Sequence, residues 1–231
     1  MPLINHGAKE AQFKIVYCGT PMGGKTTNLQ YAHRQLGSQY CGEMVSLTTS
    51  TDRTLFFDLL PVSGFDVRGF KVKLQLYTVP GQVFYNATRQ LVLKGADGIV
   101  FVADSHPDRM EDNLLSLRNL EQILGQQGRS LEEMPSILQL NKRDLPNAAP
   151  VDFMQYLLNA RQKPLPVIES VANQGHNVFH TLDTVTQMVL AEFAASLPAA
   201  QVGADLRRVS VAGSRGGPAP VPRSGAKVSV P

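Results

Sequence analysis

The sequence predicts an α/β protein with a mostly parallel central sheet and helices on both of its faces. Short apolar runs rich in β-branched residues alternate with longer segments whose apolar residues recur at helical spacing. Several of the short runs are apolar at nearly every position, as in strands that are buried on both faces. Alternation of this kind is typical of parallel sheets whose strands are joined by helices.

The first half of the chain opens with a compact apolar run, Phe13–Gly19, which we interpret as a buried strand. A helix is expected over Lys25–Gly37, because apolar residues recur on one face and a glycine closes the segment. Two further strands are expected at Gly42–Thr49 and Phe70–Val79. The second of these alternates apolar residues with Lys and Gln, so one of its faces is wetter.

The second half continues the alternation. Gly95–Asp104 is an almost fully apolar strand, and Asp108–Gly128 carries an apolar stripe at helical spacing closed by glycines. The remaining expected elements are a strand, a helix, a strand and a helix, at Pro135–Lys142, Pro150–Arg161, Pro166–Ala172 and Asn177–Leu197.

The composition changes after Leu197. Residues 198–231 are rich in Pro, Gly, Ala and Ser without periodicity, so we expect a disordered tail. Residues 199–231 carry a net charge of +4, whereas the whole chain carries only +3, so the rest sums to −1. We therefore expect one folded domain over residues 1–197, followed by a basic tail over residues 198–231.

A glycine-rich loop, GTPMGGKT over Gly19–Thr26, fits the pattern Gly-x4-Gly-Lys-Thr. It follows a predicted strand and opens a predicted helix, where backbone N–H groups and the helix dipole bind phosphates. Lys25 is expected to contact the β- and γ-phosphates, and Thr26 to offer its hydroxyl to Mg²⁺. The predicted phosphate-binding residues are Gly19, Met22, Gly23, Gly24, Lys25, Thr26 and Thr27.

A second motif, NKRD over Asn141–Asp144, follows a later predicted strand. The Asp144 carboxylate can accept hydrogen bonds from N1–H and the 2-amino group of guanine, a donor pair that adenine lacks. In the segment ESVA, the N–H of Ala172 is expected to point at guanine O6. The residues expected to contact or support the base are Asn141, Lys142, Asp144, Val171 and Ala172.

These three motifs in this order resemble those of the Ras-like small GTPases. A closer resemblance, from about Ile4 to Ala195, is to the MglA family of bacterial GTPases of cell polarity and gliding motility. It is carried by the segments TTSTDRTLFFDLLP, LYTVPGQVFYNATRQLVLKGADGIVFVADS and NKRDLPNA. The resemblance implies a Ras-like P-loop NTPase fold and a molecular switch that binds GTP with Mg²⁺ and slowly hydrolyses it to GDP.

The resemblance also implies the catalytic residues. Gln82 is expected to orient the attacking water, and Arg53 to act as an arginine finger supplied by the chain itself. A guanidinium spreads its charge and can donate two parallel hydrogen bonds, which Lys cannot copy. Thr54 is expected to close on Mg²⁺ when the γ-phosphate is present. Gly81, in the turn before Gln82, is expected to contact the nucleotide.

Two positions depart from the usual Ras-like pattern. Thr78 stands where an Asp usually serves the magnesium ion, a substitution that the MglA resemblance shares, and Asp52 is one possible stand-in. Pro21 stands where the loop usually has Gly, and the resemblance does not include this change. Proline has no N–H and a fixed φ, and its ring is expected to project towards the γ-phosphate, so we expect weakened intrinsic hydrolysis.

The expected partner, by resemblance, is a roadblock-type homodimer (MglB-like) that activates hydrolysis, and downstream polarity or motility effectors are expected to bind the GTP form. Phe56, Phe57 and the segment Val83–Leu93 flank the switch loops, either as a partner surface or as core. The small net charge gives no reason to expect nucleic acid.

Two cysteines and no long apolar run favour a cytoplasmic protein without an integral membrane segment, recruited to the cell poles in the resemblance. The tail offers at most weak peripheral contact with anionic lipid.

Two alternatives remain beside the switch. The chain could be a GTP-binding scaffold with negligible hydrolysis, of which Thr78 and Pro21 would be the signs. It could also be a metabolic P-loop kinase or ATPase, against which the motif Asn141–Asp144 argues. A phosphate-release assay separates the switch from the scaffold.

Overall fold

The computed structural model describes residues 2–47, 57–80 and 86–197. Their strands form one eight-stranded sheet in the order β3-β4-β5-β2-β6-β7-β8, with β1 paired to β2. The strands are β1 Leu3–Asn5, β2 Glu10–Gly19, β3 Val45–Leu47, β4 Phe57–Val67, β5 Phe70–Thr78, β6 Gly98–Asp104, β7 Ser136–Asn141 and β8 Val167–Glu169. The helices are α1 Lys25–Leu36, α2 Asn86–Leu93, α3 Met110–Gln126, α4 Val151–Asn159 and α5 Val178–Ser196, with a 3₁₀ helix, η2, at Pro107–Arg109.

Pairing within the sheet confirms the mostly parallel arrangement that the sequence predicts. β2 pairs in parallel with β5 and β6, and β6, β7 and β8 continue the parallel order. β1, β3 and β4 are antiparallel to their neighbours. Two antiparallel pairs, β1–β2 and β4–β5, are joined by short connections, whereas the parallel strands β6, β7 and β8 are connected through helices, as strand geometry requires.

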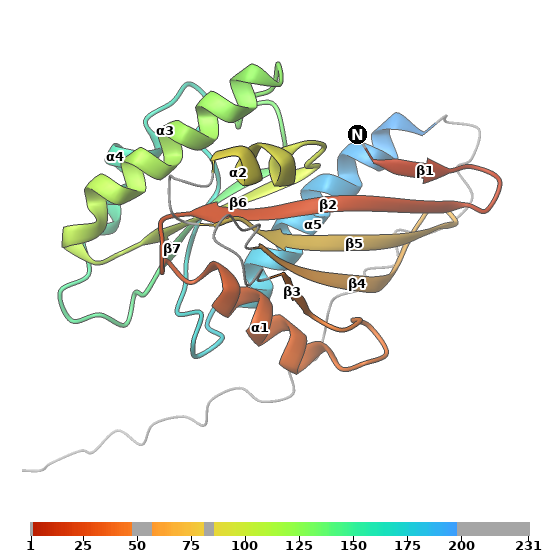
Figure 1. Cartoon of the computed structure of the whole chain (residues 1–231), viewed down its shortest axis with the longest axis horizontal. Helices are drawn as coiled ribbons and strands as arrows, with labels where there is room; N and C mark the ends of the chain where they lie inside the picture. Colours follow the sequence, from red (N-terminus) through yellow and green to blue (C-terminus); the bar gives the residue numbers. More distant parts are fainter. Residues whose placement is uncertain (1, 48–56, 81–85, 198–231) are drawn as a thin grey trace, which may run out of the picture.

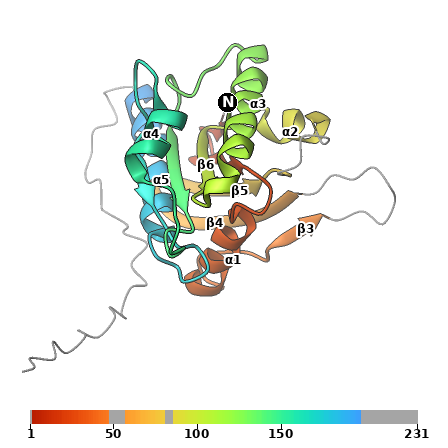
Figure 2. The ribbon, with the colours of Figure 1, turned by 90° about the vertical axis from the view of Figure 1, so that its left-hand side faces the viewer.

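Helices cover both faces of the sheet, and each face has its own hydrophobic core (Figures 1 and 2). On one face, α1 and α5 pack Leu29 and Val185 into a cluster with β2, β4 and β5. On the other face, α2, α3 and α4 pack residues such as Leu93, Leu120 and Met154 against β6 and β7. The apolar strands are therefore buried on both sides, which explains their nearly continuous hydrophobic sequences.

The carboxyl ends of the parallel strands meet at one edge of the sheet. Tyr17 of β2 lies opposite Thr78, the last residue of β5, and Asp104 at the end of β6 lies opposite Asn141 at the end of β7. Ligand sites of open α/β sheets form at this edge. The phosphate loop and the NKRD motif both begin there, although they are far apart in the sequence.

Three elements depart from the sequence prediction. β4 was not expected, because Pro61 and Gly64 interrupt its pattern and its register shifts by a bulge between Ser63 and Phe65. The short β1 and the two-turn helix α2 were also missed. Each is too short or too irregular for its hydrophobic period to stand out, and tertiary packing supplies most of its stability.

Candidate nucleotide-binding site

The phosphate loop lies between β2 and α1, as predicted. Gly19 ends β2 and Gly24 immediately precedes α1, with φ values of 132° and 102°. A Cβ at Gly19 would lie 2.0 Å from the carbonyl oxygen of Val102, and one at Gly24 would lie 2.1 Å from Asn141 Nδ2. Both positions therefore require glycine for space as well as for backbone conformation.

Lys25 is held inside this loop. Its side chain is almost fully buried, and Nζ donates hydrogen bonds to the carbonyl oxygens of Gly19 at 3.2 Å and Thr20 at 2.7 Å. The pKa of Lys25 is lowered to about 8, chiefly by burial; Cys18 and Asp58 oppose the shift, and the Arg89 guanidinium adds to it. The ammonium is thus fixed at the loop, where a phosphate group would supply the missing counter-charge.

The Thr26 hydroxyl, the predicted magnesium ligand, donates a 2.7 Å hydrogen bond to Asp58 Oδ2. Thr78, at the usual Asp position, donates from Oγ1 to the same carboxylate oxygen at 2.8 Å and accepts from the Asp58 N–H at 2.9 Å. Ser46 donates to Oδ1 at 2.7 Å. A carboxylate therefore lies beside the predicted magnesium ligand, but it comes from β4, the neighbouring strand, instead of from β5.

Sequence reasoning missed Asp58. It named Asp52 as the possible stand-in for the missing carboxylate, and Asp52 lies outside the described residues. The signal for Asp58 is the pairing of β4 with β5, in which Leu59 lies opposite Tyr77 and the next positions bring Asp58 to Thr78. Because β4 itself was not predicted, this juxtaposition was not visible in the sequence.

The donor set at this position fits magnesium. Mg²⁺ prefers oxygen ligands and is commonly held by one or two protein groups together with substrate phosphates and water. Thr26 and Asp58 supply a hydroxyl and a carboxylate within hydrogen-bond distance of each other. Among the described residues no group of three or more His, Cys, Asp or Glu is placed to hold a metal ion.

Asn141 joins the phosphate loop to the base loops. It is 2% exposed, and its Nδ2 donates to the carbonyl oxygen of Gly23 at 2.8 Å. Its Oδ1 accepts from the N–H of Ala172 at 2.9 Å and from the Ser170 hydroxyl at 3.1 Å. The N–H of Ala172, which the sequence analysis directs at guanine O6, would therefore have to share its hydrogen between the base and Asn141.

Lys142 and Asp144 flank the space where the base is expected. Asp144 is exposed, so its carboxylate is accessible to a ligand. Lys142 has a left-handed backbone conformation, with φ of 65°, and its Nζ lies 2.5 Å from Oδ2 of the buried Asp104. This ion pair anchors the end of the Lys142 side chain and thereby fixes the course of its apolar stem. Val171 closes the adjacent loop through backbone hydrogen bonds with His176.

Arg53, Thr54, Gly81 and Gln82 lie outside the described residues, so their catalytic and nucleotide-binding roles stay predictions. A residue that the sequence analysis overlooked lies in α2, shortly after the undescribed residues 81–85. Arg89 of α2 is 4% exposed and donates from Nε to the carbonyl oxygen of Pro80 and from a terminal nitrogen to Asn119 of α3. Arg89 therefore links Pro80, two residues after Thr78, to helices α2 and α3.

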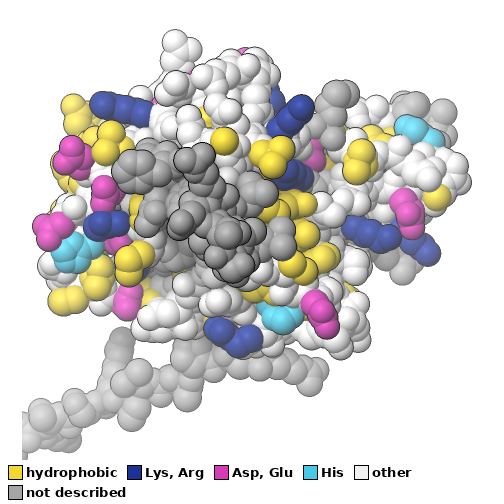
Figure 3. Space-filling view, viewed as in Figure 1, with side chains coloured by type: hydrophobic (Ala, Val, Ile, Leu, Met, Phe, Trp, Pro, Cys, Tyr) yellow, Lys and Arg dark blue, Asp and Glu magenta, His cyan; other side chains and the backbone are white. Residues whose placement is uncertain are grey.

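The described parts of the flanking aromatic and helical segments hold both core and exposed side chains, so the partner-surface interpretation stays a prediction. Phe57 is half-buried and packs against Tyr77, with ring centroids 5.7 Å apart, so it belongs to the core. In α2, Val92 and Leu93 are buried whereas Leu91 is 59% exposed. Phe56 lies outside the described residues. On the face shown in Figure 3, positive and negative side chains are interspersed.

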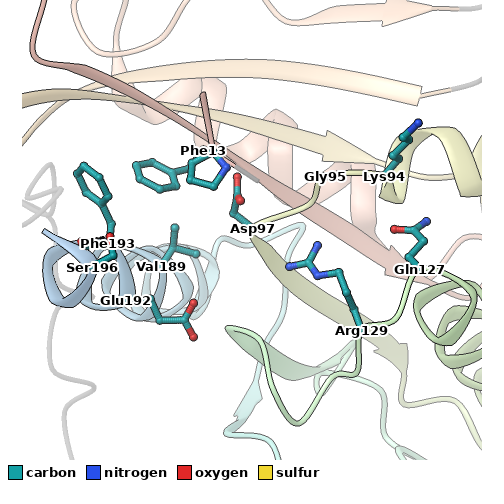
Figure 4. A pocket seen from close by; sticks show the side chains of 11 residues that line it. Phe13, Lys94, Gly95, Asp97, Gln127, Arg129, Val189, Glu192, Phe193 and Ser196 are labelled. Atoms are coloured by element: carbon teal, nitrogen blue, oxygen red, sulfur yellow. Dashed lines mark hydrogen bonds between the residues drawn. The ribbon is translucent and has the colours of Figure 1, made fainter. Parts of the chain in front are cut away.

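A separate pocket of about 610 Å³ lies at the opposite edge of the sheet (Figure 4). Asp97 and Arg129 line it, and each precedes a parallel strand, β6 and β7 respectively. Phe13 and Phe193 form its apolar wall. Because phosphate loops sit at the carboxyl ends of the strands, this pocket is not part of the nucleotide site.

The fold and site define a class of protein. The chain matches the Ras family over residues 14–191, which is most of its length. The chain therefore belongs to the Ras family, and it is a small Ras-like GTPase.

A more specific similarity confirms the resemblance to MglA-type GTPases. The chain is 52% identical over 192 residues to the Mutual gliding-motility protein MglA of Myxococcus xanthus (strain DK1622), covering 83% of this chain and 97% of that protein. Two more distant relatives are eukaryotic. The human Ras-related protein Rab-27B is 24% identical over 181 residues, covering 77% of this chain and 79% of that protein. The Ras-related protein Rab-1A of Dictyostelium discoideum is 28% identical over 171 residues, covering 71% of this chain and 82% of that protein.

Within the described ranges, none of the helices is long and apolar enough to cross a membrane.

Proposed function

We propose that this protein is a guanine-nucleotide switch that binds GTP and GDP with Mg²⁺ and hydrolyses GTP slowly on its own. The observation that carries the proposal is the 2.7 Å hydrogen bond from the Thr26 hydroxyl to the Asp58 carboxylate. This bond supports the proposal because it brings an acidic group next to the predicted magnesium ligand, although Thr78 stands where an Asp is usual. The site therefore retains the charge that a magnesium-dependent GTPase needs.

Thr26 and Asp58 would hold the ion. Thr26 would be a direct ligand, and Asp58 would accept hydrogen bonds from Thr26 or from the water molecules around the ion. Magnesium, when bound, neutralises charge on the β- and γ-phosphate oxygens. Lys25 adds a second positive charge from inside the loop. Thr54 is proposed to complete the ion's ligands in the GTP-bound form.

Base selection is proposed to rest on Asp144, with Asn141 holding the base loops to the phosphate loop. Changing Asp144 to Asn replaces an acceptor pair by one acceptor and one donor, which suits xanthine better than guanine. We expect Asp144→Asn to lose GDP affinity and gain affinity for xanthosine diphosphate, as measured by titration. Unchanged preference for GDP would overturn this assignment.

Hydrolysis is proposed to depend on Gln82 and Arg53, positioned by a partner. By analogy with the relative named for gliding motility, the switch controls cell polarity or motility through downstream effectors, acting in the cytoplasm and at the cell poles. The proposed partner is an MglB-like roadblock homodimer. Retention of such a dimer by the GTP-analogue form, but not by the GDP form, supports this proposal, and failure to retain it in either form opposes it.

Pro21 is proposed to slow intrinsic hydrolysis. Its ring is fixed and lacks an N–H, so the loop has less freedom to admit Gln82 and Arg53 to the γ-phosphate. Single-turnover hydrolysis by Pro21→Gly is expected to be faster than by the parent, and equal rates would refute this role.

The alternative function is a GTP-binding scaffold with negligible hydrolysis. Phosphate release measured with and without the roadblock partner separates the two, because a scaffold releases none in either case. We also propose that residues 1–197 are the complete GTPase domain and that the basic tail, residues 198–231, makes at most weak peripheral contact with anionic lipid.

A further inference from the structure

Arg109 links the start of α3 to the middle of the phosphate loop. A terminal nitrogen of its guanidinium donates a 2.9 Å hydrogen bond to the carbonyl oxygen of Pro21, 88 residues earlier in the chain. Arg109 ends the 3₁₀ helix η2 and immediately precedes α3. The contact therefore joins the loop residue that departs from the family pattern to a helix on one face of the sheet.

The guanidinium is itself held in place. Its other terminal nitrogen lies 2.6 Å from Asp112 Oδ2, one turn into α3, and the backbone N–H of Arg109 donates to the carbonyl oxygen of His106 at 2.9 Å. The Arg109 side chain is only 32% exposed. A side chain fixed at both its base and its head can impose an orientation on the peptide to which it donates, because little further entropy is lost in making the bond.

This contact determines where the Met22 N–H points. The Pro21–Met22 peptide is planar and trans, so its carbonyl and its N–H point in opposite directions. Arg109 draws the Pro21 carbonyl towards α3 and thereby turns the Met22 N–H away from α3. The proline ring fixes φ of Pro21 but leaves the rotation of this peptide about ψ open. Met22 also has a left-handed φ of 59°, which a non-glycine residue adopts only at a cost.

We propose that Arg109 is a positioning residue of the nucleotide site, which aims the Met22 N–H at the phosphates by holding the Pro21 carbonyl. The proposal rests on the proposed guanine-nucleotide function. Lys25 and the N–H groups at the start of α1 (Lys25–Leu36) are expected to bind the rest of the phosphate chain without this peptide. We expect the Pro21–Met22 peptide to lie on the γ-phosphate side, so losing Arg109 should weaken GTP binding more than GDP binding.

The test compares the affinities of full-length variants for GDP and for a non-hydrolysable GTP analogue, in the presence of Mg²⁺. One charge-assisted hydrogen bond corresponds to about a tenfold change. We expect Arg109→Ala to lose about tenfold in affinity for the analogue, with GDP affinity and melting temperature close to the parent's. Arg109→Lys, which can donate to one carbonyl, should recover part of the loss, and Asp112→Asn should show a smaller loss in the same direction.

Arg118→Ala is the matched control, because Arg118 is an exposed arginine on the same helix without a hydrogen bond or ion pair among the described residues. It should behave as the parent. If Arg109→Ala lost affinity equally for GDP and the analogue and had a lower melting temperature, the role of Arg109 would be merely structural. If both affinities were unchanged, the contact with Pro21 would have no effect on nucleotide binding. Either result overturns the inference while leaving the proposed function intact. A parent chain that binds neither nucleotide would overturn both.

Discussion

Asp58 and Thr78 show how a site can keep its charge after losing the residue that usually carries it. The two side chains share a hydrogen bond across neighbouring strands, and Thr26 donates to the same carboxylate. Moving the acid from β5 to β4 keeps it within 2.7 Å of the loop hydroxyl. Thr78 is therefore better described as a hydrogen-bond donor to the relocated acid than as a lost catalytic residue.

Asp58→Asn is expected to weaken magnesium-dependent GDP binding by about tenfold to a hundredfold, because a charged hydrogen-bond partner is lost beside the ion. Titration of GDP with and without Mg²⁺ measures the effect. Asp66→Asn is the matched control, because Asp66 is an exposed Asp on the same strand, far from the loop. A similar loss in both variants would contradict the role given to Asp58.

The two cysteines are expected to be unreactive in the native protein. Burial raises the pKa of Cys18 to about 12, so at pH 9 only about 0.1% of it is thiolate. Burial also raises the pKa of Cys41. A disulfide reagent at pH 8 should label neither thiol before unfolding and both afterwards, and reactivity should rise as pH approaches the raised pKa. Rapid native labelling, assigned with Cys41→Ser, would show that one thiol is accessible.

Among the elements, the junction of β2 with β6 fixes where the phosphate loop begins. The amino acid change Gly19→Ala places a Cβ 2.0 Å from a backbone oxygen of β6, which cannot move aside as a side chain can. Gly128 also has a positive φ, of 67°, but a Cβ there meets nothing within 4 Å. Comparing alanine substitutions at these two glycines therefore distinguishes the cost of backbone strain alone from the cost of strain plus steric conflict.

Gly128→Ala is expected to lower the free energy of unfolding by about 1 kcal/mol, the cost of a left-handed alanine. Gly19→Ala is expected to cost more than about 3 kcal/mol, since the clash adds to the strain. Denaturant unfolding of both variants measures the difference. Equal costs would mean that β2 and β6 adjust at this junction.

The element-level prediction succeeded where the hydrophobic period was long or the strand was fully apolar. The run Phe13–Gly19 and the segment Asp108–Gly128 were recognised as β2 and α3, with small shifts at their ends. β4 was missed because proline, glycine and a bulge disrupt its alternation. That single omission concealed Asp58, since an antiparallel neighbour of β5 was needed to bring a carboxylate to the site.

For the whole molecule, the sequence was sufficient for the class of fold and for the position of the predicted phosphate and base loops between strands and helices, because these loops carry fixed residue patterns. It was insufficient for the contacts that join them. Asn141 bridges two loops through Gly23 and Ala172, and Arg109 bridges α3 and Pro21. Such contacts depend on strand order and helix placement, which no local pattern encodes.

The folded unit is expected to be independent of the tail. In α5 and at the residue after it, Leu182, Val185, Val189, Phe193 and Leu197 pack into the core. A chain ending at Leu197 should therefore keep the parent's GDP affinity and a melting temperature within roughly 4 °C, since a shift of that size corresponds to about 1 kcal/mol. A larger fall, or weaker GDP binding, would place part of the domain in residues 198–231.

Single-turnover phosphate release from the full-length chain mixed with GTP or ATP in Mg²⁺ tests the central claim most directly. We predict that GTP is converted to GDP and phosphate, slowly but completely, that ATP is not, and that Asp58→Asn slows the reaction at least about tenfold. Intact GTP after prolonged incubation with the roadblock partner, or equal turnover of ATP, would contradict the claim that this chain is a magnesium-dependent GTPase.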